Sequence, residues 1–112
     1  MTMHAHPRDL KSNTAARLMS IAAIRARLSM LAVAYAARIG AVNMNDVLAT
    51  ASAVVAVFGE DHDLSREMRG FVDSLPELRR HVPDLASAGD RLIRAVERTT
   101  WPDADGRADI HG

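Results

Sequence analysis

The longest helical pattern in the chain runs from Asn13 to Ile39, a stretch in which no residue breaks a helix. Ser12 or Asn13 can cap its start, because a short side-chain oxygen satisfies an orphan backbone amide. Gly40 suits its end, because glycine adopts the left-handed conformation that often closes a helix. The pattern therefore predicts a long first helix, roughly 39 Å in length at 1.5 Å per residue.

A second helix is expected from Met44 to Phe58, where Gly59 stops it. Asn43 is a good N-cap, and Asp46 three residues later can reach back in a variant of the capping box. Only about four residues link this helix to the first, and so short a link favours an antiparallel hairpin.

Apolar residues at helical spacing predict a short third helix that contains Leu64, Met68 and Leu75, with Asp63 or Ser65 as its cap.

Two prolines, Pro76 and Pro83, are expected to bracket one turn before a fourth helix over about residues 84–99. Within that helix, Asp90 and Arg94 are spaced to form a favourable ion pair. Its apolar stripe consists of Leu85, Ala88, Leu92, Ile93 and Val96.

The expected fold is all-α: a small bundle of about four helices with the long first helix as its spine. At 112 residues the chain is at most one domain, and we find no internal repeat and no strand pattern of useful length. We expect a single helical domain over residues 13–100, with flexible segments over residues 1–12 and 101–112.

The first helix has apolar residues on two sides. One side carries large side chains, namely Ile21, Ile24, Leu28, Leu31, Tyr35, Ile39 and Val42. The other carries smaller or more flexible ones, namely Met19, Ala22, Ala26, Met30, Val33 and Ala37. Because the large residues follow the spacing typical of a core-facing side, we expect them to pack against the chain's own helices. Ser20, Arg27 and Arg38 fall together on a narrow polar strip.

The side with smaller residues is predicted to be a protein interface, because small residues let backbones approach closely and methionine adapts to irregular partners. The partner is either another protein or a second copy, and a homodimer is the expected arrangement. Only four residues are aromatic, so the core buries little area per side chain, and small domains of this kind often recruit a second chain. The alternative is that the other helices of the same chain cover this side.

The net charge is zero, but the charges are segregated. Residues 1–45 hold six basic and one acidic residue, whereas residues 46–78 hold two basic and seven acidic residues. Such segments can complement each other within one chain or between two chains.

No transmembrane segment is predicted, because the longest charge-free run of the first helix has ten residues and a span needs about 20. The start of the chain does not resemble a signal peptide, since Asp9 lies in the would-be basic region and Arg17 interrupts the apolar run. The chain contains no cysteine, which fits a reducing cytoplasm, and 13 arginines to one lysine suggest a bacterial source.

No motif indicates catalysis, a cofactor, a metal ion or a small-molecule substrate. The one cluster of carboxylates with an imidazole, residues 60–63, lies on a turn where adjacent side chains diverge, which makes a metal site unfavourable. His4 and His6 are only generic metal ligands. The sequence of residues 79–81, Arg-Arg-His, is typical of a solvated basic turn. No serine has a neighbouring base, and cysteine is absent.

The most consistent interpretation is a non-enzymatic helical protein that acts through protein binding, as a regulator, adaptor or inhibitor. The alternative is a small transcriptional regulator that binds nucleic acid through its basic first helix. DNA reading by the second helix is disfavoured, because that helix has no lysine or arginine and Asp46 lies at its start.

Overall fold

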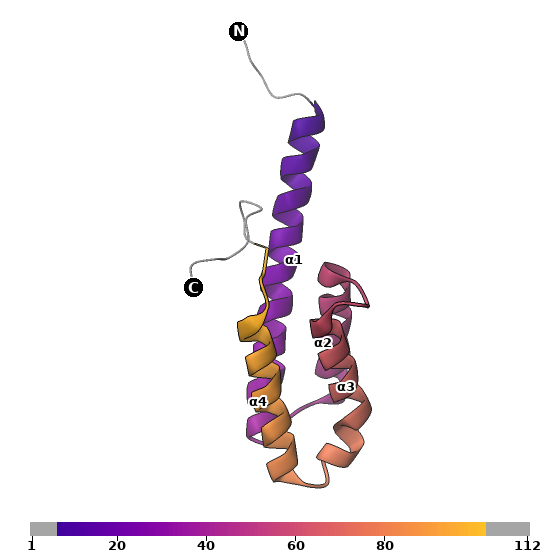
Figure 1. Cartoon of the computed structure of the whole chain (residues 1–112), viewed down its shortest axis with the longest axis vertical. Coiled ribbons are helices and arrows are strands. Elements are labelled where there is room, and N and C mark those ends of the chain that lie inside the picture. The colour runs from indigo at the N-terminus through magenta and orange to yellow at the C-terminus, as the bar shows by residue number, and fades with distance from the viewer. Residues whose placement is uncertain (1–6, 103–112) are drawn as a thin grey trace.

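The computed structural model describes residues 7–102, and their side chains from residue 14 onward. Within these residues the chain forms four α-helices, which are α1 (Pro7–Arg38), α2 (Met44–Phe58), α3 (Asp63–Leu78) and α4 (Val82–Arg98). α1 packs against α2 and α4, and α3 packs against the same two helices from the other side of the bundle. Figure 1 shows that α1 is much longer than the other three and extends beyond them at its N-terminal end. The predicted all-α bundle with a long first helix and an α1–α2 hairpin is confirmed.

The first helix begins earlier than predicted. α1 starts at Pro7, so residues 7–12, which the sequence predicts to precede the helix, are helical. Proline is well suited to the first helical position, where its missing amide hydrogen has no helical partner to lose. An acidic residue such as Asp9 is also favoured in the first turn by the helix dipole. The remaining residues of the predicted flexible segment, 1–6, lie outside the described part of the chain.

The two prolines do not bracket a separate turn. Pro76 lies in the last turn of α3, which continues to Leu78, and Pro83 lies in the first turn of α4. Pro76 has no amide hydrogen to donate to the carbonyl of Val72, so the end of α3 has one helical hydrogen bond fewer. Pro83 is favourable where it lies, because the first turn of a helix needs no amide donors.

The turn glycines and the cap of α2 agree with the prediction. Gly40 and Gly59 both have positive φ, at 73° and 87°, which L side chains rarely adopt. The Asn43 side chain accepts hydrogen bonds from the amides of Asn45 and Asp46, at 2.8 Å and 3.2 Å. These contacts fix the start of α2 next to the end of α1.

The cap of α3 was predicted wrongly. His62, rather than Asp63 or Ser65, caps the helix, because its Nδ1 accepts a hydrogen bond of 3.0 Å from the Leu64 amide. Its ring is held for this role by stacking on Phe58, with the ring centroids 4.3 Å apart. Ser65 is buried and donates instead to the carbonyl of Gly59.

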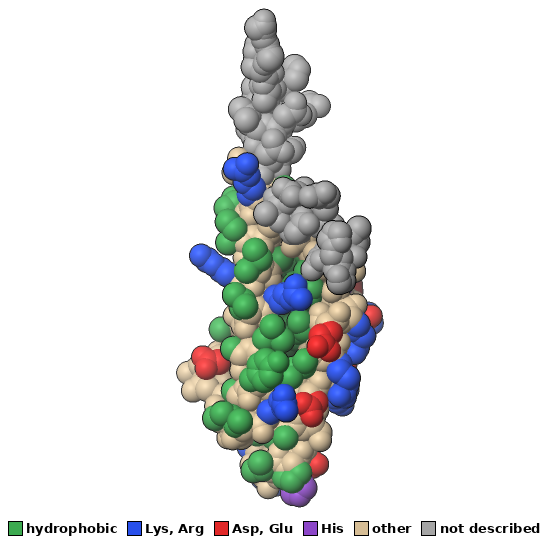
Figure 2. Space-filling model, turned by 90° about the vertical axis from the view of Figure 1, so that its left-hand side faces the viewer, with side chains coloured by type: hydrophobic (Ala, Val, Ile, Leu, Met, Phe, Trp, Pro, Cys, Tyr) green, Lys and Arg blue, Asp and Glu red, His purple; other side chains and the backbone are tan. Residues whose placement is uncertain are grey.

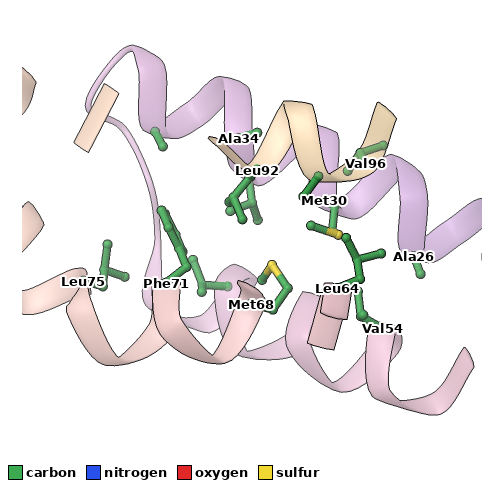
Figure 3. Close-up of a cluster of buried hydrophobic side chains, with 14 of the residues drawn as sticks. Ala26, Met30, Ala34, Val54, Leu64, Met68, Phe71, Leu75, Leu92 and Val96 are labelled. Carbon is green, nitrogen blue, oxygen red and sulfur yellow. The ribbon is translucent and has the colours of Figure 1, made fainter. Parts of the chain in front are cut away.

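The core contains side chains from all four helices, as Figure 3 shows. Met30 of α1 and Val54 of α2 lie in the same cluster as Met68 of α3 and Leu92 of α4, and all four are almost inaccessible to solvent. Most members of the cluster are aliphatic, so close packing rather than large aromatic area stabilises the bundle.

The C-terminal boundary of the domain also differs from the prediction. Trp101, which the sequence predicts in a flexible tail, is buried with 3% of its surface exposed. Its Nε1 donates to the carbonyl of Val96 at 3.0 Å, and its ring meets Phe58 edge-on at 5.1 Å between centroids. Burying an indole together with a satisfied donor holds the chain against the bundle just after α4. The rest of that predicted tail, from residue 103, lies outside the described residues.

Candidate protein-binding surface

The structure reverses the assignment of the two sides of α1. Ala26, Met30, Val33 and Ala37, four of the six predicted interface residues, are at most 4% exposed within a single chain. Their side of the helix faces the other helices of the bundle, so they form the chain's own core. In the folded bundle these four side chains are therefore not accessible to a separate partner.

The two remaining predicted interface residues lie near the N-terminal end of the bundle. Met19 is exposed, and Ala22 is half-buried.

The physical reason for the reversal is a close approach between α1 and α4. A Cβ atom built on Gly89 of α4 would lie 2.5 Å from the carbonyl oxygen of Ala34 and 3.1 Å from the Cβ of Ala37. Two helices can come this close only where the facing side chains are minimal, as in a glycine against alanines. The small residues of α1 therefore serve contacts within the chain, and the large ones are turned outward.

The outward-facing large residues form a continuous apolar band along α1, which we call the outer stripe. Four of its members are about half exposed or more: Ile21 at 47%, Ile24 at 51%, Leu28 at 61% and Tyr35 at 52%. The fifth member, Leu31, is partly buried. Figure 2 shows apolar side chains gathered along α1, with basic side chains beside them. Ile39, 79% exposed, continues the apolar surface just past the end of the helix.

The polar strip predicted on α1 lies against the C-terminal part of the chain. Arg38 forms an ion pair of 3.3 Å with Asp90 of α4, so Asp90 contacts α1 instead of the predicted Arg94. The guanidinium of Arg27 lies over the Trp101 ring, 5.9 Å from its centroid. Ser20 is buried and donates to the carbonyl of Ala16. This strip therefore helps to join α1 to the end of the chain.

The four arginines of α1 whose side chains the structure describes do not form one basic face. Arg27 and Arg38 lie toward the C-terminal part of the chain, whereas Arg17 and Arg25 are exposed elsewhere on the helix.

One stretch, Thr14–Arg38, is long and apolar enough to cross a membrane by length and composition alone. A third of its most apolar window is buried inside the bundle, and Arg25 and Arg27 lie in its middle. A core helix of a globular protein passes the same test, so α1 is not a clear transmembrane segment.

Two shallow grooves flank α3. The groove between α3 and α4 is lined by Glu67, which contacts Arg91 at 3.8 Å and Arg98 at 3.9 Å. The groove between α2 and α3 is mostly apolar, and Arg69 at its edge donates to the carbonyl of Glu60. Both sets of charged groups are thus engaged in contacts at the surface.

In the cluster at residues 60–63, Asp61 and Asp63 are exposed, whereas His62 is half-buried and stacks on Phe58. In the described part of the chain, no three histidine or acidic side chains are grouped so that they could hold a metal ion. His4 and His6 lie outside that part. His81, just before the start of α4, contacts Asp84 in the first turn of that helix at 3.1 Å.

Comparison of the chain with protein families, with curated proteins and with solved structures gave no match. The outer stripe is therefore interpreted from its own chemistry. The periodicity of α1 revealed both apolar sides but did not show which one is buried. The signal that could have decided it is Gly89, which lies among the apolar residues of α4 and needs a small-residue partner surface.

Proposed function

We propose that this protein is a non-enzymatic binding module that docks a partner protein on the outer stripe of α1. The main support for the proposal is that about half or more of the surface of Ile24 and of Leu28 is exposed to solvent. Both residues lie in the middle of a helix whose other side packs in the core. Isolated exposed apolar residues are ordinary on protein surfaces, but a contiguous band of them is typical of a protein interface.

The form of the band indicates the kind of partner. Its residues recur every three or four positions, which is the spacing by which one helix packs along another. We therefore infer that the partner contributes an amphipathic helix. A regulator, an adaptor or an inhibitor would each use such a surface. The absence of cysteine supports a cytoplasmic location as part of this proposal.

The proposal is tested by photo-crosslinking in the native cell, with a benzophenone amino acid in place of Leu28. A matched control carries the same group in place of Ser87, an exposed residue of α4 that is outside the stripe. We expect crosslinks to protein from position 28 and at most background from position 87, because only the first faces a docked partner. Equal crosslinking from both positions, or none from either, would contradict the proposed function.

A further inference from the structure

We infer that the occupant of the outer stripe is a second copy of this chain, packed with its α1 antiparallel to the first. This inference rests on the proposed function and specifies its partner. Three features of the stripe support it: its spacing, its area and the placement of charge around it.

The spacing of the stripe fits a helix pair with knobs-into-holes packing. Ile21, Ile24, Leu28, Leu31 and Tyr35 alternate steps of three and four residues, which is the pattern of the a and d positions of a coiled coil. Leu28 is its midpoint, seven residues from each end of the stripe. A twofold axis can therefore pass through Leu28, perpendicular to α1. The stripe of one copy then faces the stripe of the other, as a symmetric dimer requires.

The exposed area approaches what a dimer needs. If a fully exposed large side chain presents roughly 200 Å², the four half-exposed members of the stripe and Ile39 present on the order of 600 Å². A standard interface buries about 800 Å² per partner, and the alanines and arginine stems beside the stripe can supply the remainder. The second bundle does not obstruct this packing, because the core of each copy lies on the opposite side of α1 from the stripe.

The charges favour the antiparallel direction. In the described part of α1 beyond the first turn, Arg17, Arg25, Arg27 and Arg38 have no acidic residue among them. A parallel pair would place each arginine level with its own copy, and such like-charge contacts are unfavourable. The antiparallel register offsets them: Arg27 is level with Ser29 and Arg25 with Leu31 of the other copy, so like charges remain near the twofold axis but are not directly opposed.

In the antiparallel pair, Arg17 is level with Ile39 of the other copy. There it lies near the negative end of that copy's α1 dipole. Asp46 is exposed in the first turn of α2, beside the groove between α1 and α2, and supplies an acidic side chain at the same end of the bundle. Arg38 of the other copy lies at nearly the same level but is paired with Asp90 of its own chain. The antiparallel helix dipoles and Asp46 thus favour Arg17 at each end of the interface.

Light scattering tests the second copy directly. For the purified wild-type chain at about 100 μM we expect twice the chain mass of 12.2 kDa, since specific dimers commonly have dissociation constants well below this concentration. We expect Leu28→Arg to halve the measured mass, because two arginines would meet on the twofold axis. Circular dichroism of the variant should retain the helical signal, since Leu28 is outside the core. A wild-type mass of one chain would overturn the inference.

The direction is tested with single-cysteine variants, since the chain contains no cysteine of its own. After mixing and mild oxidation, Ile21→Cys and Tyr35→Cys should form a mixed disulfide, and neither variant alone should form one. Efficient linking of Ile21→Cys to itself would show a parallel pair and overturn the antiparallel arrangement.

Different results would overturn the dimer and the proposed function. A monomeric wild-type chain whose position 28 still crosslinks to another protein would overturn the dimer and leave the docking surface intact. A monomeric chain that floats with vesicles of phosphatidylcholine and phosphatidylserine, without protein crosslinks, would assign the stripe to a lipid surface and overturn both.

Discussion

Replacing Ala26 by arginine is expected to lower the free energy of unfolding by about 3–5 kcal/mol, the usual cost of a buried charge without a partner. Ala26 is fully buried against the other helices, so the long side chain has no route to solvent without separating them. Small domains have only about 5–15 kcal/mol of stability in total. Urea unfolding followed by circular dichroism measures the change.

The matched control is Ala15→Arg. Ala15 lies on the same side of the same helix, but in the part of α1 near its projecting end, and it is exposed. Alanine and arginine have similar helix propensities, and we expect this variant to change stability by less than about 0.5 kcal/mol. Equal losses for both variants would mean that arginine itself harms α1, and that burial by the bundle is not the cause.

Replacing Gly89 by alanine is expected to destabilise the fold, although glycine to alanine usually strengthens a helix by about 1 kcal/mol. The added methyl group would meet the backbone carbonyl of Ala34, which cannot turn away as a flexible side chain could. Relieving the contact requires α1 and α4 to move apart, and overpacking of this kind costs about 1–3 kcal/mol. The net expectation is a loss of about 1 kcal/mol in the free energy of unfolding.

Gly70→Ala provides the comparison. Gly70 also lies inside a helix, but a Cβ atom there would have no neighbour within 4 Å. We expect this change to stabilise the protein by about 0.5–1 kcal/mol through helix propensity alone. Opposite signs for the two glycines support the close α1–α4 contact, and a gain in stability at both positions would refute it.

Much of the fold was predictable because the signals that set it are local. Gly40 ends the first helix through its own backbone freedom, and Asn43 begins the second by bonding to amides within three residues. The cap by His62 was not predictable in this way. It depends on the orientation of an imidazole that stacks on Phe58, a contact between two elements.

The candidate site was harder to predict, because helical periodicity identifies the apolar sides of a helix but does not show which of them is buried. Large apolar side chains such as Leu28 remove the most area from water when they are buried. The sequence therefore predicts that the stripe lies in the core. The contact between Gly89 and Ala34 overrides that preference by bringing two backbones together. Trp101 was missed for a related reason, since its burial depends on Phe58 and Val96 of two other elements.

The central claim is that one apolar side of α1 packs in the core of the chain and that the outer stripe binds a partner. The most direct test compares Leu28→Arg with Met30→Arg, which are two residues apart on the helix. Both are measured by urea unfolding at a concentration where light scattering gives the mass of one chain. We expect Leu28→Arg to stay within about 1 kcal/mol of wild type, because its side chain remains in solvent. We expect Met30→Arg, which buries the charge, to lose most of the helical signal. Unfolding of Leu28→Arg to the same extent would place Leu28 in the core and contradict the account.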